Sequence, residues 1–522
     1  MRRMTGWNWM TAGLLGLGMG CATDESTSDG SPTGTAGCTE SRYPQVEGEA
    51  IHVATTCSSD EPDGSAAAPY STLTEALAAA PAGATIAVAP GTYAETLEIG
   101  RDVRIVGLVD ESKGIILQAP REGDAAIILK RPAPESADII LQVPSPDALG
   151  IILKSPAPET AAVRVVGGAA LTLEGVRISD AARAGIEVES GSLVLASSRV
   201  EGTRAIGEDF GSGVVGRAGT SVTVRDSVVT GSAGVAVYFE KATGAIERSL
   251  LDANAKGGVL VKSTVQGSII LQDSVITGNG TAGVVVRGGR RIILKRTAVT
   301  ATTLDARGVG DGVVVLDQDG VASSVSLEAG TTLAGNARVG LLVSGASSVT
   351  VDGAVVTSND RGGIWLQHDA GSSDAEGVAI TGTAIADNGF VGVAATLGAS
   401  MRLSGSAVLS TVARVGFSGI AEIEVADGIG LLAGARARIE GNDIDDNPRV
   451  GIVADDLEAA GLYIGDNTIS QSPVGIILQR PKDQVPTLAA NTFEGTGEDL
   501  RIPTTEADLL PIPKAVQEGI AE

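Results

Sequence analysis

Side chains suited to proton transfer and to sugar stacking stand together in the stretch GIWLQHDAGSSDAEG. Trp365 can stack its aromatic face on a sugar ring, and His368 beside Asp369 can move protons. Asp374 and Glu376 follow in the same predicted loop. We therefore take His368 and Asp369 as candidate catalytic residues and Trp365 as a candidate binding residue. The simpler interpretation is a large side chain in a strand, followed by a histidine in an exposed loop.

Carboxylates also cluster in NDIDDN, residues 442–447. Asp445 and Asp446 form a second pair of candidate catalytic residues, and the oxygen atoms of this turn could hold Ca²⁺. However, Asn447 belongs to a repeated position described below, and exposed aspartates are common in turns. We therefore expect no bound metal and no other cofactor, and keep calcium as the one candidate ion.

The composition argues against one rounded core. The chain has 522 residues, 70 glycines and only 2% aromatic residues. Small β-branched side chains suit thin, stacked strands better than a globule that needs large side chains to fill it. The net charge of −25 disfavours binding to phosphates, so no nucleic-acid partner is expected. The one obvious basic cluster, which we interpret as a solvated strand edge, contains Arg287, Arg290, Arg291, Lys295 and Arg296.

The first residues, MRRMTGWNWMTAGLLGLGMGC, contain arginines and then a short apolar stretch that ends in small residues before Cys21. Residues 1–20 resemble a bacterial lipoprotein signal peptide, although Gly18 stands where that family favours leucine. The resemblance implies that Cys21 is lipidated and becomes the mature N-terminus. Because no aspartate follows the cysteine, it favours the outer membrane or cell surface of a Gram-negative bacterium, with the periplasmic face as the alternative.

Residues 21–37 are rich in Ser, Thr, Gly and Asp, which predicts a flexible tether. If Cys21 carries lipid, Cys38 and Cys57 remain as an even pair in an oxidising compartment, and we expect a disulfide between them. This bond would close a loop of roughly twenty residues and contribute about 3 kcal/mol to stability. The alternative is two free thiols. Residues 38–68 are thus predicted to be a disulfide-linked N-terminal segment.

A glycine followed by alternating apolar residues recurs along the rest of the chain, mostly at steps of 21 to 29 residues, and GVAV at Gly234 is one example. This period is too short for repeats of paired helices and fits one turn of three strands. Asparagine tolerates the left-handed backbone of a tight turn, and stacked amides can hydrogen-bond to one another. Gln471 stands four residues before its repeat glycine, Gly475, and asparagine has this place in six repeats: Asn254, Asn279, Asn336, Asn359, Asn388 and Asn447.

A helix is predicted where this region begins, because Ser71 or Thr72 can cap LTEALAAA and Pro81 can stop it. TIAVAPGTYAETLEI then alternates as strand, turn and strand. With the asparagine positions, this pattern resembles right-handed parallel β-helix proteins of the pectate-lyase-like superfamily. The resemblance implies an all-β, single-stranded right-handed parallel β-helix over residues 69–500, with a short N-terminal capping helix and an asparagine ladder. Residues 501–522 are predicted to be a C-terminal tail or cap.

Four 12-residue repeats occupy residues 115–162, each with the triplet IIL and a proline three positions after its leucine. Two such units have the length of one coil, so the four could add two coils in which IIL is a strand and the proline lies at a corner. The alternative is a flap outside the solenoid.

Enzymes of this superfamily carry motifs that are absent here. The sequence lacks the polygalacturonase pattern, in which adjacent aspartates are followed by a later Gly-His, and it lacks the Gly-Arg-Pro-Trp of pectin methylesterases. We therefore expect a non-catalytic, envelope-anchored lipoprotein that acts in surface display, adhesion, or glycan or protein binding. Its expected partners are the membrane, through the lipid anchor, and a glycan or protein ligand. The alternatives are a polysaccharide lyase or glycoside hydrolase that acts on an extracellular acidic polysaccharide, and a pure spacer.

Overall fold

The computed structural model describes residues 43–57, 59–108, 151–154, 161–206, 211–262, 267–289, 291–372, 377–419, 421–480 and 486–520. Those residues belong to one compact unit, Gly37–Glu522. The predicted signal peptide, tether, Cys21 and Cys38 lie outside the described residues. No helix in the described part of the chain is long and apolar enough to cross a membrane.

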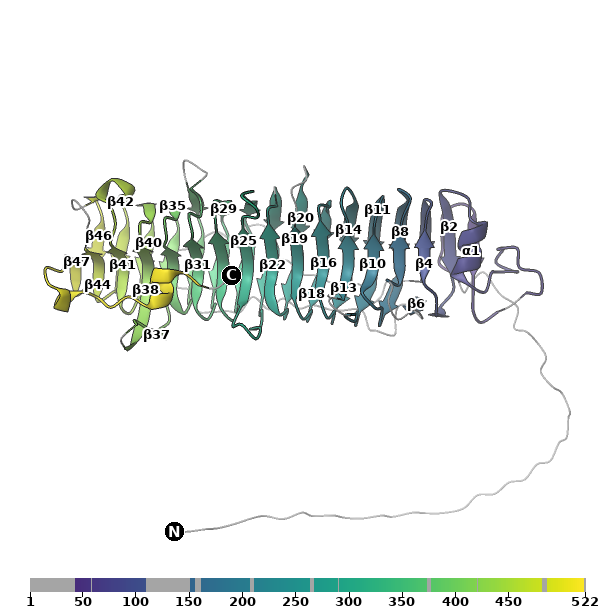
Figure 1. The fold of residues 1–522 in the computed structure, drawn as a ribbon, viewed down its shortest axis with the longest axis horizontal. Helices are drawn as coiled ribbons and strands as arrows, with labels where there is room; N and C mark the ends of the chain where they lie inside the picture. Colours follow the sequence, from purple (N-terminus) through teal and green to yellow (C-terminus); the bar gives the residue numbers. More distant parts are fainter. Residues whose placement is uncertain are drawn as a thin grey trace, which may run out of the picture. The chain divides into compact units, whose positions relative to one another are not determined.

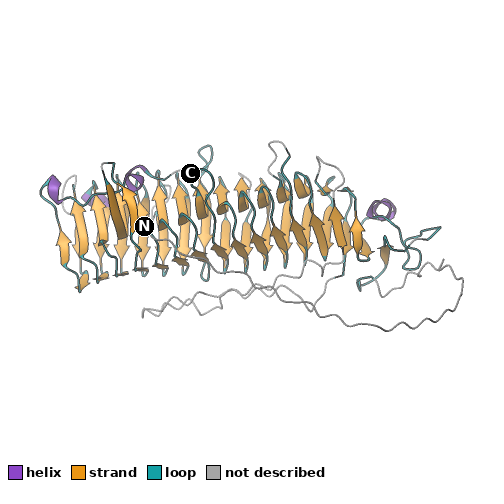
Figure 2. Cartoon of the chain, turned by 90° about the horizontal axis from the view of Figure 1, so that it is seen from below, coloured by secondary structure: helices purple, strands orange, loops and turns teal. Residues whose placement is uncertain are grey.

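The described chain forms a right-handed parallel β-helix in which three long sheets run side by side (Figures 1 and 2). Each coil contributes one strand to each sheet, which confirms the predicted fold class. Sheet A contains β1 (Ala50–Val53), β2 (Ala84–Val88), β5 (Val103–Val106), β8 (Ala170–Glu174), β11 (Ser192–Ala196), β14 (Ser221–Arg225), β17 (Thr243–Glu247), β20 (Ile269–Gln272), β23 (Ile292–Lys295), β26 (Ser324–Leu327), β29 (Ser348–Asp352), β32 (Val378–Thr381), β35 (Ser400–Ser404), β39 (Arg436–Glu440), β42 (Leu462–Gly465) and β45 (Thr487–Ala489).

Sheet B is built from short strands. Its members are β3 (Gly91–Tyr93), β6 (Ile151–Lys154), β9 (Val176–Ser179), β12 (Arg199–Glu201), β15 (Val228–Thr230), β18 (Leu250–Asp252), β21 (Val275–Thr277), β24 (Ala298–Thr300), β27 (Thr332–Ala334), β30 (Val355–Thr357), β33 (Ala384–Ala386), β36 (Ala407–Leu409), β40 (Asp443–Asp445), β43 (Thr468–Ser470) and β46 (Thr492–Glu494).

Sheet C has the longer strands. Its members are β4 (Leu97–Ile99), β7 (Val163–Val165), β10 (Ala184–Val188), β13 (Ser212–Gly216), β16 (Val235–Glu240), β19 (Gly257–Lys262), β22 (Thr281–Arg287), β25 (Gly310–Leu316), β28 (Val339–Ser344), β31 (Gly362–Gln367), β34 (Phe390–Ala395), β38 (Glu422–Leu432), β41 (Val450–Asp455), β44 (Val474–Gln479) and β47 (Glu498–Arg501), with β37 (Arg414–Phe417) paired antiparallel to β38. The fourth IIL copy is β6, which pairs with β3 and β9 in sheet B. The first three copies lie outside the described residues.

The interior is a stack of small aliphatic side chains, one from each coil. Because side chains alternate across a strand, every second residue of a strand points inward, and parallel pairing places it on its counterpart in the next coil. On sheet C the stacked residues are all buried, and they are Ile186, Val214, Val237, Val259, Val284, Val313, Leu341, Ile364, Val393, Ile429, Ile452 and Ile476.

The recurring glycine lies near the start of each sheet C strand, and close packing between neighbouring coils explains why glycine is needed there. A Cβ on Gly283 would lie 2.1 Å from Val299 Cγ1 and 2.8 Å from the carbonyl oxygen of Gly312 in the next coil. The prediction of Gly234 as a member of this series is wrong. The strand register pairs Val214 with Val237, so Ala236 takes the position.

The corner between sheets B and C carries the predicted asparagine ladder. Asn254 Nδ2 donates to Asn279 Oδ1 at 2.9 Å, and Asn336, Asn359 and Asn388 continue in the same way at 2.8 and 2.9 Å. Asn447 lies in the same corner, where its Oδ1 accepts from Thr411 Oγ1 at 2.7 Å.

Two details of the predicted ladder are wrong. The left-handed residue is the one before the asparagine: Ala253, Gly278, Gly335, Ser358, Asp387 and Asp446. Gln471 has this left-handed backbone, with φ of 49°, and so is not a member of the ladder. The hydroxyl of Ser472 accepts from the Asn447 backbone N–H instead.

A second ladder follows the corner between sheets A and B, and the sequence analysis missed it. In the N-terminal coils it consists of serines: the Ser227 backbone N–H donates to Ser249 Oγ, and that of Ser249 donates to Ser274 Oγ. In the last coils it consists of asparagines, where Asn442 Nδ2 donates to Asn467 Oδ1 and Asn467 Nδ2 donates to Asn491 Oδ1, both at 2.9 Å.

The N-terminal end of the solenoid is closed by α1 (Leu73–Ala79), as predicted. Thr72 caps the helix through a capping box with Glu75, and Leu73 and Ala76 are buried against the first coils. Cys57 is buried in a small separate cluster with Tyr43 and Ala54. Because Cys38 lies outside the described residues, the disulfide stays a prediction.

The C-terminal tail follows a different course from that of an end cap. After β47 and the short 3-10 turn η5 (Glu506–Asp508), it runs back along sheet C toward the middle of the solenoid and ends in α2 (Lys514–Glu518) and Ile520 (Figure 1). We call residues 510–520 the strap. The last coil remains exposed, with Leu500 37% accessible.

Candidate binding surface

The outward side chains of sheet C form a row that changes character along the solenoid. It begins with the charged residues Glu98, Arg164 and Glu187. From the next coil onward the row is apolar until it ends at Arg501 in the last strand. We call this apolar part the apolar row: Val215, Tyr238, Leu260, Val285, Val314, Leu342, Trp365, Ala394, Gly430, Val453 and Ile477.

The strap covers the C-terminal part of the apolar row. Ile512 and Val516 of the strap are buried in one outer cluster with Trp365, and this cluster is separate from the interior core. Trp365 is only 1% exposed, so its ring is not accessible to a sugar while the strap is in place, and its binding role stays a prediction. The alternative interpretation, a large side chain in a strand, agrees with the structure. The indole Nε1 of Trp365 is nevertheless buried without a hydrogen-bond partner.

Two glutamines hold the strap at its ends. Gln479 in β44 donates from Nε2 to the Leu510 carbonyl at 3.1 Å and accepts from the Leu510 N–H at 3.0 Å. Gln367 in β31 makes the same two bonds with Ile520, at 3.0 and 2.8 Å. Each side-chain amide thus pairs with the backbone of one strap residue as a neighbouring strand would.

Buried ion pairs line the margin of the covered part. Arg449 is paired with Asp427 and also donates from Nη1 to the Pro511 carbonyl at 2.8 Å. Arg338 is paired with Asp311 through both oxygens of the carboxylate. Burial raises the pKa of Asp311 and of Asp427, while the partner arginines act in the opposite direction.

Between the buried Val215 and the buried Val314, the apolar row is partly exposed. Tyr238, Leu260 and Val285 lie side by side on β16, β19 and β22 and are partly exposed. Burial raises the pKa of Tyr238, and the nearby Glu240 adds to the effect. Three exposed cations, which form no ion pair with any residue that the structure describes, lie on β22 and at the two ends of β19. We call the whole group the open patch: Tyr238, Leu260, Val285, Lys256, Lys262 and Arg287.

The predicted catalytic pair His368 and Asp369 lies in an exposed turn directly after β31, and both residues have left-handed backbones. His368 Nδ1 is 3.1 Å from Ser344 Oγ. Trp365 is on the same strand but lies under the strap, so the structure does not bring these three side chains to one site. Asp374 and Glu376 lie outside the described residues.

The other candidate pair lies on sheet B. Asp445 Oδ1 accepts from Ser470 Oγ at 2.7 Å, and Asp446 is the left-handed residue before Asn447. Burial raises the pKa of Asp443, and Asp445 and Glu494 add to the effect. No group of three or more His, Cys, Asp or Glu within the described residues is arranged to hold a metal ion.

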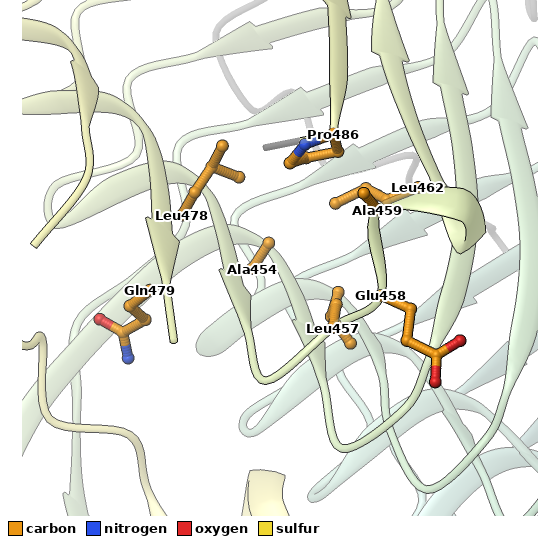
Figure 3. Close-up of a pocket in the computed structure, with 8 residues that line it drawn as sticks. All are labelled: Ala454, Leu457, Glu458, Ala459, Leu462, Leu478, Gln479 and Pro486. Carbon is orange, nitrogen blue, oxygen red and sulfur yellow. The ribbon is translucent and has the colours of Figure 1, made fainter. Parts of the chain in front are cut away.

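A shallow pocket near the C-terminal end is too small to be a ligand site (Figure 3). It measures about 230 Å³ with open solvent included, below the ~300–1,000 Å³ of typical small-molecule sites. Its lining lies around the 3-10 turn η4 (Ala459–Gly461) and is mainly apolar: Ala454, Leu457, Glu458, Ala459, Leu462, Leu478, Gln479 and Pro486.

Comparison with known proteins agrees with this architecture. Residues 157–299 and 312–493 match the family described as right handed beta helix region, and the chain belongs to that family. No curated protein matches the sequence. The fold is similar to that of the periplasmic alginate epimerase AlgG (10% identity, TM-score 0.40, 81% of this chain and 83% of the other).

The comparison with solved structures also found two further similar proteins. One is the A-module of the Azotobacter vinelandii mannuronan C-5 epimerase AlgE4, with 15% identity and a TM-score of 0.36 over 80% of this chain and 89% of the other. The other is PfbA, a surface adhesin of Streptococcus pneumoniae, with 10% identity and a TM-score of 0.29 over 67% of this chain and 89% of the other.

Proposed function

We propose that this protein is a non-catalytic recognition protein of the cell envelope that binds an acidic glycan chain along the open patch. The observation that carries the proposal is a group of exposed cations, Lys256, Lys262 and Arg287, around a partly exposed apolar stripe; within the described part of the chain none of them forms an ion pair. They stand out in a chain with a net charge of −25, in which many other arginines are held in ion pairs.

The geometry of the open patch suits a polymer rather than a compact ligand. Neighbouring coils are ~4.8 Å apart, so three coils present a repeating surface along the solenoid axis. Tyr238 offers an aromatic ring to the apolar face of a sugar, and Lys262 and Arg287 stand on adjacent strands where successive carboxylates of a glycan could reach them.

A binding measurement tests this function. Immobilised polygalacturonate and alginate serve as carboxylated probes, and dextran is the neutral control. Lys262→Glu/Arg287→Glu should weaken binding by at least about tenfold, and added salt should weaken wild-type binding. The matched control is Arg225→Glu/Arg436→Glu, which reverses two exposed, unpaired arginines on sheet A and should leave binding unchanged.

Three outcomes would overturn the proposal. Equal binding by both double variants would show that the open patch is not the site. Release of unsaturated or reducing sugar ends would show catalysis and restore the lyase or hydrolase alternative. Retention of dextran but not of the acidic glycans would remove the charge argument.

Envelope anchoring is the second part of the proposal and rests on the N-terminal sequence. Lipidation of Cys21 would tether the solenoid at the outer membrane or cell surface through residues 21–37. Cys21→Ser should abolish incorporation of a labelled fatty acid and release the protein from the membrane fraction. Continued labelling of this variant would contradict the anchor.

A further inference from the structure

We propose that the strap is a displaceable cover and that a second part of the glycan-binding site lies beneath it, centred on Trp365. The identity of the ligand rests on the function proposed above. Opening of the strap does not, because it can be measured without any ligand.

The covered and open surfaces belong to one row. Strand register leads from Val285 in the open patch through Val314 and Leu342 to Trp365, one residue per coil. A ligand that follows the row from Tyr238 therefore reaches the buried Val314 and Leu342, which belong to the same outer cluster as Trp365, and Ile520 of the strap packs against this cluster. A chain longer than the open patch must stop there or displace the strap.

The buried surface is incompletely satisfied while the strap is closed. A buried indole N–H ordinarily has a hydrogen-bond acceptor, but the Nε1 of Trp365 has none. In the open state this N–H and the face of the ring become available, and a glycan offers hydroxyl and carboxylate oxygens to the N–H and its apolar face to the ring. Trp365 would then supply the aromatic platform that its sequence context suggested.

The strap is attached in a way that permits local opening. The segment before it, residues 504–508, is exposed, and the short helix α2 has no side-chain cap. Its described polar links to sheet C are the two glutamine clamps and the bond from Arg449 to Pro511. The solenoid beneath it is held by continuous ladders, so the strap can open at a lower free energy than global unfolding.

The decisive variant is Gln367→Ala/Gln479→Ala, which removes both clamps but leaves the apolar contacts. Gln272→Ala/Gln318→Ala is the matched control, because these two glutamines donate to the neighbouring Asp273 and Asp319 and not to the strap. Full-length protein with Trp7→Phe and Trp9→Phe has Trp365 as its only tryptophan. Acrylamide quenching of Trp365 should then rise about threefold or more in the clamp variant and stay unchanged in the control.

Hydrogen exchange of the wild-type chain provides a measurement that needs no substitution. Amides of residues 510–520 should exchange by local opening while those of β31 and β44 stay protected. Exchange of strap and sheet together, or unchanged quenching in a clamp variant that melts like wild type, would overturn the proposal. Unfolding of the clamp variant would be recognised by loss of its β-sheet circular dichroism, and the exchange result would then decide.

Glycan binding separates this proposal from the function on which it rests. If both hold, the clamp variant should bind long acidic glycans about five- to tenfold more tightly, since the cost of displacing the strap is removed. If Trp365 becomes more exposed in the clamp variant but no glycan binds, the strap is a displaceable cover and the proposed glycan ligand is wrong. If glycan binds at the open patch but the exposure of Trp365 is the same in the clamp variant and the wild type, the proposed function holds and the strap is not a displaceable cover.

Discussion

The outer face of the solenoid differs between its N-terminal and C-terminal halves, although the backbone beneath is the same. In the N-terminal coils the outward row is charged and alternates in sign, and Arg217 bridges the buried Glu187 and the partly exposed Glu240 across neighbouring strands. In the C-terminal coils the same face is apolar, its ion pairs are buried, and the strap covers it.

This difference shows that the inward and outward positions of a repeat fold are under different structural constraints. Inward positions are constrained by stacking on the coils above and below, so one pattern holds from end to end. Outward positions on sheet C carry no such constraint, so one half can be solvated and the other can be covered. The open patch lies between the charged part and the covered part of this face, and we propose that the glycan binds there.

The largest expected effect follows from breaking a buried ion pair in the covered half. Asp427→Ala leaves Arg449 partly buried without its carboxylate and should destabilise the protein by about 3–5 kcal/mol. Glu98→Ala is the counterpart in the N-terminal half. Because Glu98 is 63% exposed, its loss should cost about 0–1 kcal/mol. Urea denaturation of both variants checks the contrast, and equal midpoints would contradict it.

Aromatic residues of the apolar row provide the next contrast. Trp365→Ala should cost about 3 kcal/mol, because it leaves a cavity under the strap. Tyr238→Ala in the open patch should cost below about 1 kcal/mol, since the ring is partly exposed, yet it should weaken glycan binding. Calorimetric melting and the glycan assay together measure both effects. A Tyr238→Ala variant as unstable as Trp365→Ala would mean that the patch is structural.

The fold was predictable from the sequence because two packing constraints select particular residue types at the same position of successive coils. A Cβ at the start of a sheet C strand would strike the next coil, which selects glycine, and a buried amide at the preceding corner, between sheets B and C, selects asparagine. The second ladder was missed because serine fills it in many coils, and serine is too common to stand out until Asn442, Asn467 and Asn491 replace it.

The candidate site was much less predictable. The alternation in GIWLQ placed Trp365 on a strand, but no local pattern indicates that a segment 153 residues later bonds to Gln367 and covers the ring. Likewise, Asp446 stood out as a carboxylate in a cluster, whereas its left-handed backbone before Asn447 identifies it as a turn residue. Long-range covering and backbone conformation are properties of the folded chain.

The ladder at the corner between sheets B and C allows a third contrast. Asn359→Ala removes a buried amide bonded to Asn336 and Asn388 and should cost about 1–3 kcal/mol, because those groups are left unsatisfied. Ser232 occupies the same corner in the N-terminal half, but its buried hydroxyl has no partner. Ser232→Ala should therefore be neutral to within about 0.5 kcal/mol. Thermal melting of the two variants measures this contrast. Equal losses of stability would mean that any substitution at this corner destabilises the protein, whether or not an amide is removed.

The smallest expected effect concerns the carboxylates on sheet B, which are paired in one half and repel in the other. In the N-terminal coils, burial opposes ionisation of Glu201, but hydrogen bonds from Arg199 and Arg177 prevail and lower its pKa. In the C-terminal coils, burial raises the pKa of Asp443, and the charges of Asp445 and Glu494 raise it further.

The signs of these two shifts predict opposite responses to acid. A raised carboxyl pKa means that the charged form costs stability above the folded-state pKa and that this cost disappears as the pH falls through it. Asp443→Asn should therefore stabilise the protein at pH 7 by at most about 0.5 kcal/mol and lose this advantage at pH 3. Glu201→Gln should destabilise it at pH 7, and this difference should also shrink in acid as Glu201 becomes protonated. Paired thermal melts at the two pH values check both signs, and a stabilising effect of Asp443→Asn that persists at pH 3 would show that repulsion between the carboxylates is not its cause.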